Sequence, residues 1–91
     1  MSTRATVTVT IVNRLGLHAR PAMCFVDLAS TFQSNVTVRR GDQEVDGKSI
    51  MHMMMLAATK GTALEIVADG PDAEKACEAL RQLVDGGFDE E

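Results

Sequence analysis

The chain has 91 residues, a net charge of −4 at pH 7 and no tryptophan or tyrosine. This length fits one domain, which we expect to span residues 1–91. The acidic balance and the scarcity of aromatic side chains argue against nucleic acid as a partner, and no apolar stretch is long enough to cross a bilayer.

The first half of the chain alternates between strand and helix patterns. Residues 5–12 alternate valine or isoleucine with threonine, which predicts a strand with one buried face. Over residues 19–32 the apolar side chains recur at helical spacing. Residues 35–40 and 43–46 then predict a hairpin around the turn Gly41-Asp42.

The second half repeats these patterns. Ser49 is predicted to cap a short helix from Ile50 to about Ala58, and residues 63–68 alternate as a further strand. The last helix is predicted to open with Pro71 near its first position and to end at Gly86-Gly87. A short acidic tail follows.

The resulting order is strand, helix, strand, strand, helix, strand, helix. Strands with one polar face are typical of an antiparallel sheet that is open to water on one side. We therefore predict an α+β fold: an open-faced two-layer sandwich of βαββαβα topology, with a four-stranded antiparallel sheet and three helices on one face.

His18 lies where a strand pattern gives way to a helix pattern. As the N-cap it would precede the free backbone N–H groups of Ala19 and Arg20, which together with the helix dipole favour an anion. Arg20 adds a guanidinium that suits phosphate oxygens, and Gly16 permits the sharp approach that leaves the ring exposed. The same field favours a neutral, nucleophilic imidazole. On spacing alone, a plain capping or solvated histidine stays open.

Residues 13–22, Asn-Arg-Leu-Gly-Leu-His-Ala-Arg-Pro-Ala, resemble the active-site segment of HPr. HPr is the histidine-containing phosphocarrier of the bacterial phosphotransferase system. Residues 47–51 resemble the second motif of that family, and Lys60-Gly61-Thr62 precedes the last strand as it does in HPr. The resemblance covers nearly the whole chain and implies the same open-faced βαββαβα fold.

The resemblance implies that His18 accepts a phosphoryl group, on Nδ1 in the family, from Enzyme I charged by phosphoenolpyruvate. His18 would pass it to a IIA-type protein, with Arg20 assisting and Ala19, Arg20 and Gly16 forming the phosphate site. Such a carrier forms a covalent phosphohistidine but is not a stand-alone enzyme; we expect a monomer that needs no cofactor. The alternatives are a regulatory binding module that carries no phosphate on His18 and a small-molecule-binding domain.

Ser49 is the second candidate site. Its hydroxyl, as a helix cap, would meet free N–H groups, so a phosphate there would be stabilised. The resemblance implies phosphorylation by an HPr serine kinase, which hinders the histidine reaction. A plain capping serine is the other interpretation.

The predicted helix from Ile50 contains four methionines, which cannot all face inward. Helical geometry turns Met53 and Leu56 toward the core and leaves His52 at the surface. Flexible core filling, an alternative role, is expected to account for at least half of these methionines. The resemblance implies an exposed partner-docking patch of Met23, Ile50, Met51 and Met54.

Several departures from sugar-branch HPr proteins narrow the resemblance. Those proteins often carry lysines where this chain has Asp27 and Ser30. Asp27, the Asn-Arg-Leu-Gly start and the tail at residues 87–90 look more like the nitrogen-related paralogue NPr. They favour a regulatory phosphorelay over direct sugar uptake.

The two cysteines, Cys24 and Cys77, are far apart and lie in helical patterns. No apolar signal-peptide region follows the N-terminus, so we expect reduced core thiols in a cytoplasmic protein. The two histidines have no cysteine or carboxylate at ligand spacing, so we expect no metal site.

Overall fold

The computed structural model describes residues 3–90; Met1, Ser2 and Glu91, the last residue of the acidic tail, lie outside the described residues. Its elements in chain order are β1 (Thr3–Thr10), α1 (Ala19–Ala29), β2 (Asn35–Arg40), β3 (Gln43–Asp46), α2 (Ile50–Met55), β4 (Ala63–Gly70), α3 (Ala73–Asp85) and the 3-10 turn η1 (Gly87–Asp89).

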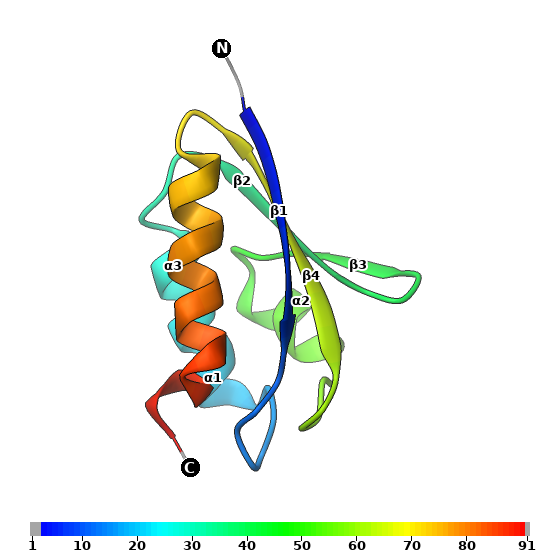
Figure 1. The fold of residues 1–91 in the computed structure, drawn as a ribbon. Helices are drawn as coiled ribbons and strands as arrows, with labels where there is room; N and C mark the ends of the chain where they lie inside the picture. The colour runs from blue at the N-terminus through cyan, green and yellow to red at the C-terminus, as the bar shows by residue number, and fades with distance from the viewer. Residues whose placement is uncertain (1–2, 91) are drawn as a thin grey trace.

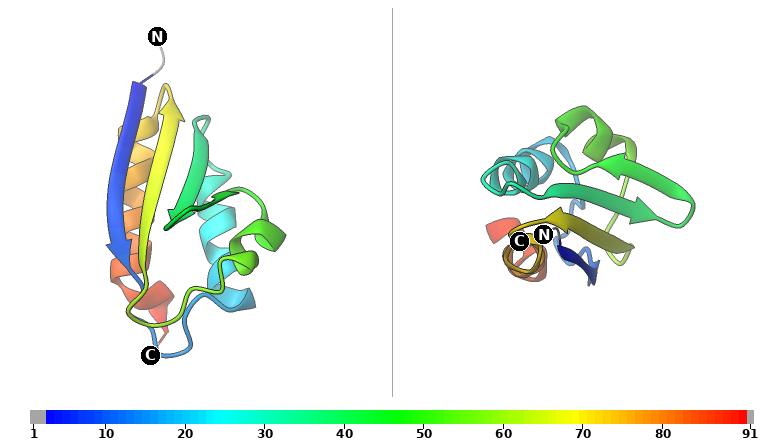
Figure 2. Two further views of the ribbon diagram at one scale, coloured as in Figure 1. Left: turned by 90° about the vertical axis from the view of Figure 1, so that its right-hand side faces the viewer. Right: turned by 90° about the horizontal axis from the view of Figure 1, so that it is seen from above.

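The four strands form one antiparallel sheet in the order β1-β4-β2-β3. Helices α1 and α3 run side by side across one face of it, and α2 packs beside α1 (Figures 1 and 2). The other face carries the outward threonines of β1 and stays open. The predicted α+β open-faced sandwich is confirmed.

The register aligns the buried side chains of neighbouring strands. Val9 of β1 lies opposite Leu64 of β4, and Val38 of β2 lies opposite Ile66 of β4. These four side chains are buried, whereas Thr8 and the other outward threonines of β1 are exposed. The alternation read from the sequence therefore selects the correct face of the sheet.

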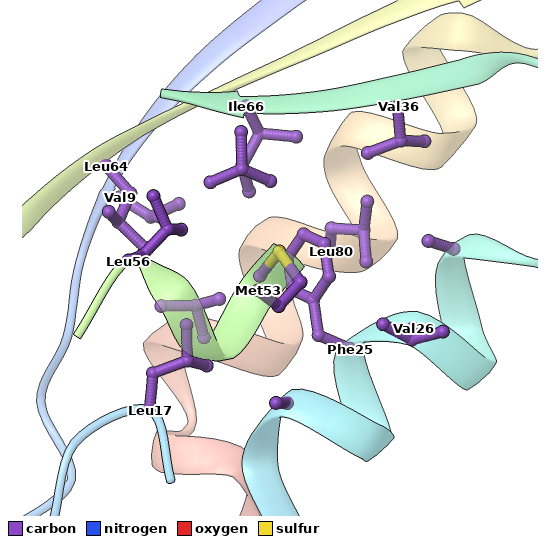
Figure 3. Close-up of a cluster of buried hydrophobic side chains, with 14 of the residues drawn as sticks. Val9, Leu17, Phe25, Val26, Val36, Met53, Leu56, Leu64, Ile66 and Leu80 are labelled. Atoms are coloured by element: carbon purple, nitrogen blue, oxygen red, sulfur yellow. The ribbon is translucent and has the colours of Figure 1, made fainter. Parts of the chain in front are cut away.

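The core lies between this face and the helices. Phe25 from α1, Met53 from α2 and Leu80 from α3 converge beneath Ile66 and Val36 of the sheet (Figure 3). Each buried side chain of this size contributes roughly 1.5–3 kcal/mol relative to its exposed state. The short helix α2 has only Met53 buried within its bounds, so the sheet and the two longer helices provide most of the core.

Several expected boundaries differ from the structure. β1 covers Thr3–Thr10 rather than residues 5–12, α1 ends at Ala29 rather than at residue 32, and β4 extends to Gly70 rather than to residue 68.

Two further differences concern helix ends. Helix α2 ends at Met55 rather than near Ala58, because Ala57 adopts a positive φ of 49° and the carbonyl of Leu56 accepts a hydrogen bond from Arg40. Pro71 does not occupy the first turn of α3; it precedes the N-cap Asp72. Both places are contacted by other segments: Arg40 lies at the end of α2, and the Asp72 carboxylate accepts hydrogen bonds from Gln33 and Ser34.

The expectation of two core thiols is half wrong. Both cysteines are free, and Cys77 is buried on α3, but Cys24 is exposed on α1. The buried positions of α1 include Ala22, Phe25 and Val26, so position 24 falls outside the apolar stripe. Cys24 is therefore a surface thiol.

None of the helices within residues 3–90 combines the length and the apolar character that crossing a membrane requires.

Candidate functional site

The loop from β1 to α1 turns sharply at Gly16, which has a φ of +72°. A Cβ at this position would lie 2.5 Å from the carbonyl oxygen of Ala58, and the next amide, Leu17, donates a 2.8 Å hydrogen bond to that same oxygen. Gly16 itself is buried, and its N–H donates to Asn13. Its role in the geometry is thus to shape the approach to α1, while its own N–H is already used.

His18 is the N-cap residue of α1, as predicted, with extended backbone angles (φ −80°, ψ −172°). Its side chain makes no hydrogen bond to the helix. The first intrahelical bond runs from the N–H of Ala22 to the carbonyl of His18. Across residues 3–90, the N–H groups of Ala19 and Arg20 have no hydrogen-bond partner. Two free N–H groups at the start of α1 therefore lie beside the imidazole, an arrangement that suits an anion.

The His18 ring is held from one side by the C-terminal tail. Its Nε2 lies 2.9 Å from Oε1 of Glu90, and the side chain of His18 is 37 % exposed. Nδ1 has no partner among the described residues. The ring is therefore neither packed away nor fully free, and its unpartnered nitrogen is Nδ1.

Asn13 joins the tail to the loop between β1 and α1. Its Nδ2 donates to the carbonyl of Gly16 at 2.8 Å and to Oε1 of Glu90 at 2.9 Å. Asn13 is buried, and its Oδ1 has no hydrogen-bond partner in the part of the chain that the structure describes. The same carboxylate oxygen of Glu90 thus accepts from Asn13 while it contacts His18.

The electrostatics of this cluster favour an ionised Glu90. The hydrogen bond with His18 lowers the pKa of Glu90 below its ordinary value, and the hydrogen bond from Asn13 and the positive charge of Arg20 act in the same direction. Arg20 is exposed and forms no ion pair within residues 3–90. Its guanidinium is available to an incoming anion.

Glu90 is the site residue that sequence reasoning missed, because the tail reads as a solvated acidic end. Phe88 is buried despite its place in that tail, and both Phe88 and Asp89 adopt positive φ values of 57° and 59°. The buried ring fixes the tail against the core, and the left-handed turn brings the end of the chain to the loop after β1 (Figures 1 and 2). There Glu90 contacts Asn13 and His18. The signal in the sequence was a phenylalanine among acidic residues.

Ser49 caps α2, as predicted. Its hydroxyl oxygen accepts a hydrogen bond from the N–H of His52 at 3.3 Å. His52 is exposed, and its Nδ1 accepts from the N–H of Asp46 at 3.3 Å. The Ser49 hydroxyl is thus occupied in closing its own helix.

The predicted docking residues are all exposed, on the two contacting helices α1 and α2. Met51 is the most open, at 78 %, and Met55 is also exposed. The expectation that core filling explains at least half of the α2 methionines is wrong, because only Met53 is buried. Met51, Met54 and Met55 are exposed. The exposed residues of the predicted patch are Met23, Ile50, Met51 and Met54.

No group of three or more histidine, cysteine or carboxylate side chains within residues 3–90 is placed to hold a metal ion.

Comparison with known proteins places these features in a family. A family model described as the PTS HPr component phosphorylation site matches residues 5–85. The phosphocarrier protein HPr of Neisseria meningitidis is 51 % identical over 80 residues, which are 88 % of this chain and 90 % of that protein. The phosphocarrier protein NPr of Proteus mirabilis is 45 % identical over 84 residues, 91 % of this chain and 93 % of that protein.

Among solved structures, HPr-C-His from Thermoanaerobacter tengcongensis has a TM-score of 0.92 and 42 % sequence identity. The match covers 96 % of this chain and 98 % of that chain. Both the sequence and the fold therefore match over nearly the full length.

Proposed function

This chain belongs to the HPr family of phosphotransferase-system phosphocarriers, and from that premise we propose that His18 accepts a phosphoryl group from phosphorylated Enzyme I and passes it to a IIA-type protein. The observation that carries the proposal is the half-exposed His18 ring, whose Nδ1 has no partner in residues 3–90 and which lies at the open start of α1.

The reaction needs no other nucleophile. The lone pair of His18 Nδ1 forms the new N–P bond while the bond between phosphorus and its donor atom on Enzyme I breaks, and the electron pair of that bond stays with the donor. The free N–H groups of Ala19 and Arg20 and the dipole of α1 stabilise the phosphoryl oxygens. Because phosphoryl transfer depends on positioning and charge stabilisation, a small carrier and its partner can share one site.

Phosphoenolpyruvate and Enzyme I provide the direct test. We expect one acid-labile, base-stable phosphate per chain, absent in His18→Ala. His52→Ala is the matched control, since it removes the other histidine from an exposed position and should keep full labelling. An unlabelled wild type, or a label that survives in His18→Ala, would refute the proposal. Charging by sugar-branch against nitrogen-branch Enzyme I then assigns the branch.

Arg20 is the second group in the proposed site. Its exposed guanidinium can bridge phosphoryl oxygens in a way that a single ammonium cannot. We expect Arg20→Ala to slow phosphoryl acceptance roughly 10–100-fold and Arg20→Lys to recover part of that loss. Equal rates in Arg20→Ala and wild type would remove Arg20 from the site.

The exposed apolar residues on α1 and α2 are proposed as the docking patch for Enzyme I and IIA-type proteins. Methionine suits a surface that fits several partners, and Met51 projects furthest into solvent. We expect Met51→Ser to raise the KM for both partners while the chain stays folded. Thr8→Ser, on the open face of the sheet, is the control; an unchanged KM in Met51→Ser would exclude this residue from docking.

Ser49 is proposed as a regulatory site for an HPr serine kinase. The support is its N-cap position beside exposed Ile50 and Met51, where a phosphate would add negative charge to the proposed docking patch. Incubation with the kinase and ATP should label wild type but not Ser49→Ala. Labelling of Ser49→Ala at the wild-type level would place the modification elsewhere.

We also propose that the carrier acts in the cytoplasm as a monomer, because transient relay partners need the docking patch free. The unpaired Cys24 and Cys77 suit a reducing compartment. Light scattering across a concentration series measures the mass, and a constant monomer mass is expected.

A further inference from the structure

The contact between His18 and Glu90 joins residues that lie 72 positions apart in the chain. The Glu90 carboxylate contacts the ring at Nε2 and leaves Nδ1 without a partner among the described residues. It is also tied to the loop after β1 through Asn13, whose amide group donates to the same oxygen. Two contacts therefore hold Oε1 of this carboxylate beside the ring.

An ionised carboxylate can only accept hydrogen bonds, so the atom that faces it must be a donor. In a neutral imidazole one nitrogen carries the proton and the other carries the lone pair. The contact with Glu90 thus selects the form with the proton on Nε2 and the lone pair on Nδ1. In that form the nitrogen without a partner among residues 3–90, Nδ1, carries the lone pair and is the nucleophile.

The same contact matches the charge that the reaction creates. When Nδ1 forms an N–P bond while Nε2 keeps its proton, the ring becomes cationic; no proton needs to move. The positive end of the α1 dipole disfavours that cation, whereas the carboxylate of Glu90, 2.9 Å from Nε2, favours it. A hydrogen bond between ions is also stronger than one between a neutral ring and an ion.

We propose that Glu90 is a positioning residue of the phosphoryl site: held by Asn13, its carboxylate fixes the His18 tautomer with the proton on Nε2 and balances the positive charge that the ring gains when Nδ1 is phosphorylated. The second half of this inference rests on the proposed function of His18. The first half concerns the unphosphorylated protein and stands independently of it.

The tautomer is measured by two-bond ¹⁵N–¹H correlation spectra of the unphosphorylated protein, at a pH where the ring is neutral. We expect wild type to carry the proton on Nε2 and Glu90→Ala to show a several-fold larger fraction with the proton on Nδ1. Asp89→Asn removes the neighbouring negative charge at an exposed position, where asparagine tolerates the positive φ of 59°, and should keep the wild-type spectrum. An unchanged spectrum in Glu90→Ala, or a wild-type ring protonated on Nδ1, would overturn the proposal.

The charge effect is measured with an isosteric pair in the same tail. Glu90→Gln and Asp89→Asn each remove one negative charge, but only Glu90→Gln removes the charge that contacts the His18 ring. We expect Glu90→Gln to slow phosphoryl acceptance from Enzyme I about tenfold and Asp89→Asn to stay within about twofold of wild type. Equal slowing in both variants would mean that only the total negative charge of the tail matters, which would contradict the proposal.

The two measurements separate the two claims about the site. If wild type accepts no phosphoryl group while its ring shows the expected tautomer, the proposed function fails and only the selection of the tautomer by Glu90 stands. If wild type is phosphorylated but Glu90→Ala leaves the tautomer unchanged and Glu90→Gln leaves the rate unchanged, the carrier function stands and the role of Glu90 fails.

Discussion

Helices α1 and α2 both begin after an N-cap residue in an extended conformation, but they differ in whether the cap side chain binds the free N–H groups of the helix. His18 and Ser49 are both N-cap residues with extended backbone angles, but the Ser49 hydroxyl closes its helix by accepting from His52, and His18 turns to Glu90 instead. A closed cap stabilises its own helix, whereas an open start can bind an anion. The difference shows that the open start of α1 must be held by tertiary contacts rather than by its own cap.

The largest effect on stability is expected from a substitution at Gly16, which shapes the approach to the start of α1. Gly16→Ala would place a methyl group 2.5 Å from the carbonyl of Ala58 at a φ of +72°, so we expect the free energy of unfolding to fall by about 3 kcal/mol. Gly41→Ala is the control, because it shares a positive φ but meets nothing within 4 Å; it should cost about 1 kcal/mol. Urea unfolding measures both, and equal losses would mean that the close approach at Gly16 contributes nothing.

A smaller effect compares the two caps directly. Ser49→Ala removes the hydrogen bond to His52 and should lower the free energy of unfolding by about 1 kcal/mol. His18→Ala removes no cap bond from α1 and should lower it much less, while abolishing phosphoryl acceptance. The comparison fails if thermal unfolding shows His18→Ala to be the more destabilised variant.

The start of α3 shows a third arrangement, in which the N-cap residue Asp72 is a carboxylate whose effect on stability depends on pH. The Asp72 carboxylate accepts hydrogen bonds from Gln33 and Ser34 rather than from its own helix. The Ser34 hydroxyl bond, followed by the Gln33 amide bond, lowers the pKa of Asp72 from 3.8 to about 2. The ionised form is therefore favoured by folding.

Because the folded-state pKa of Asp72 is depressed, its contribution to stability is fully present above about pH 4 and is lost as the pH falls toward 2. In Asp72→Asn the free energy of unfolding should decrease less between about pH 4 and pH 2 than in wild type. Above about pH 5 the substitution should not change how this free energy depends on pH. Urea midpoints measured at several pH values check this. A wild-type slope that persists unchanged in Asp72→Asn would assign the acid sensitivity to other carboxylates.

The last prediction concerns the reactivity of one thiol on the outer face of α1 and one on the inner face of α3, and it involves no change in stability. Cys24 is exposed on α1, whereas burial raises the pKa of the Cys77 thiol. A thiol reagent in the native protein should therefore label Cys24 at least tenfold faster than Cys77. Cys24→Ser and Cys77→Ser identify which site is labelled, and comparable rates at both sites would contradict the burial of Cys77.

Much of the fold could be predicted because its signals are local. The alternation of Val9 with its threonine neighbours and the helical spacing of Phe25 both report which face of an element is buried. The N-cap positions of His18 and Ser49 follow from the change of period at those residues. The end of α2 could not be predicted, because Arg40 from another element binds the carbonyl groups of Leu56 and Ala57, just after the helix.

The candidate site also has a part that depends on local sequence and a part that depends on distant contacts. The sequence by itself determined that His18 would precede a helix with free amides, since periodicity and capping depend on residues within one or two turns. Only the tertiary structure decided that Glu90, 72 positions away, would meet the ring, and that Asp72 would bind Ser34, 38 positions away. Such contacts form because buried anchors such as Phe88 bring distant segments together, and no local pattern records which segments those anchors join.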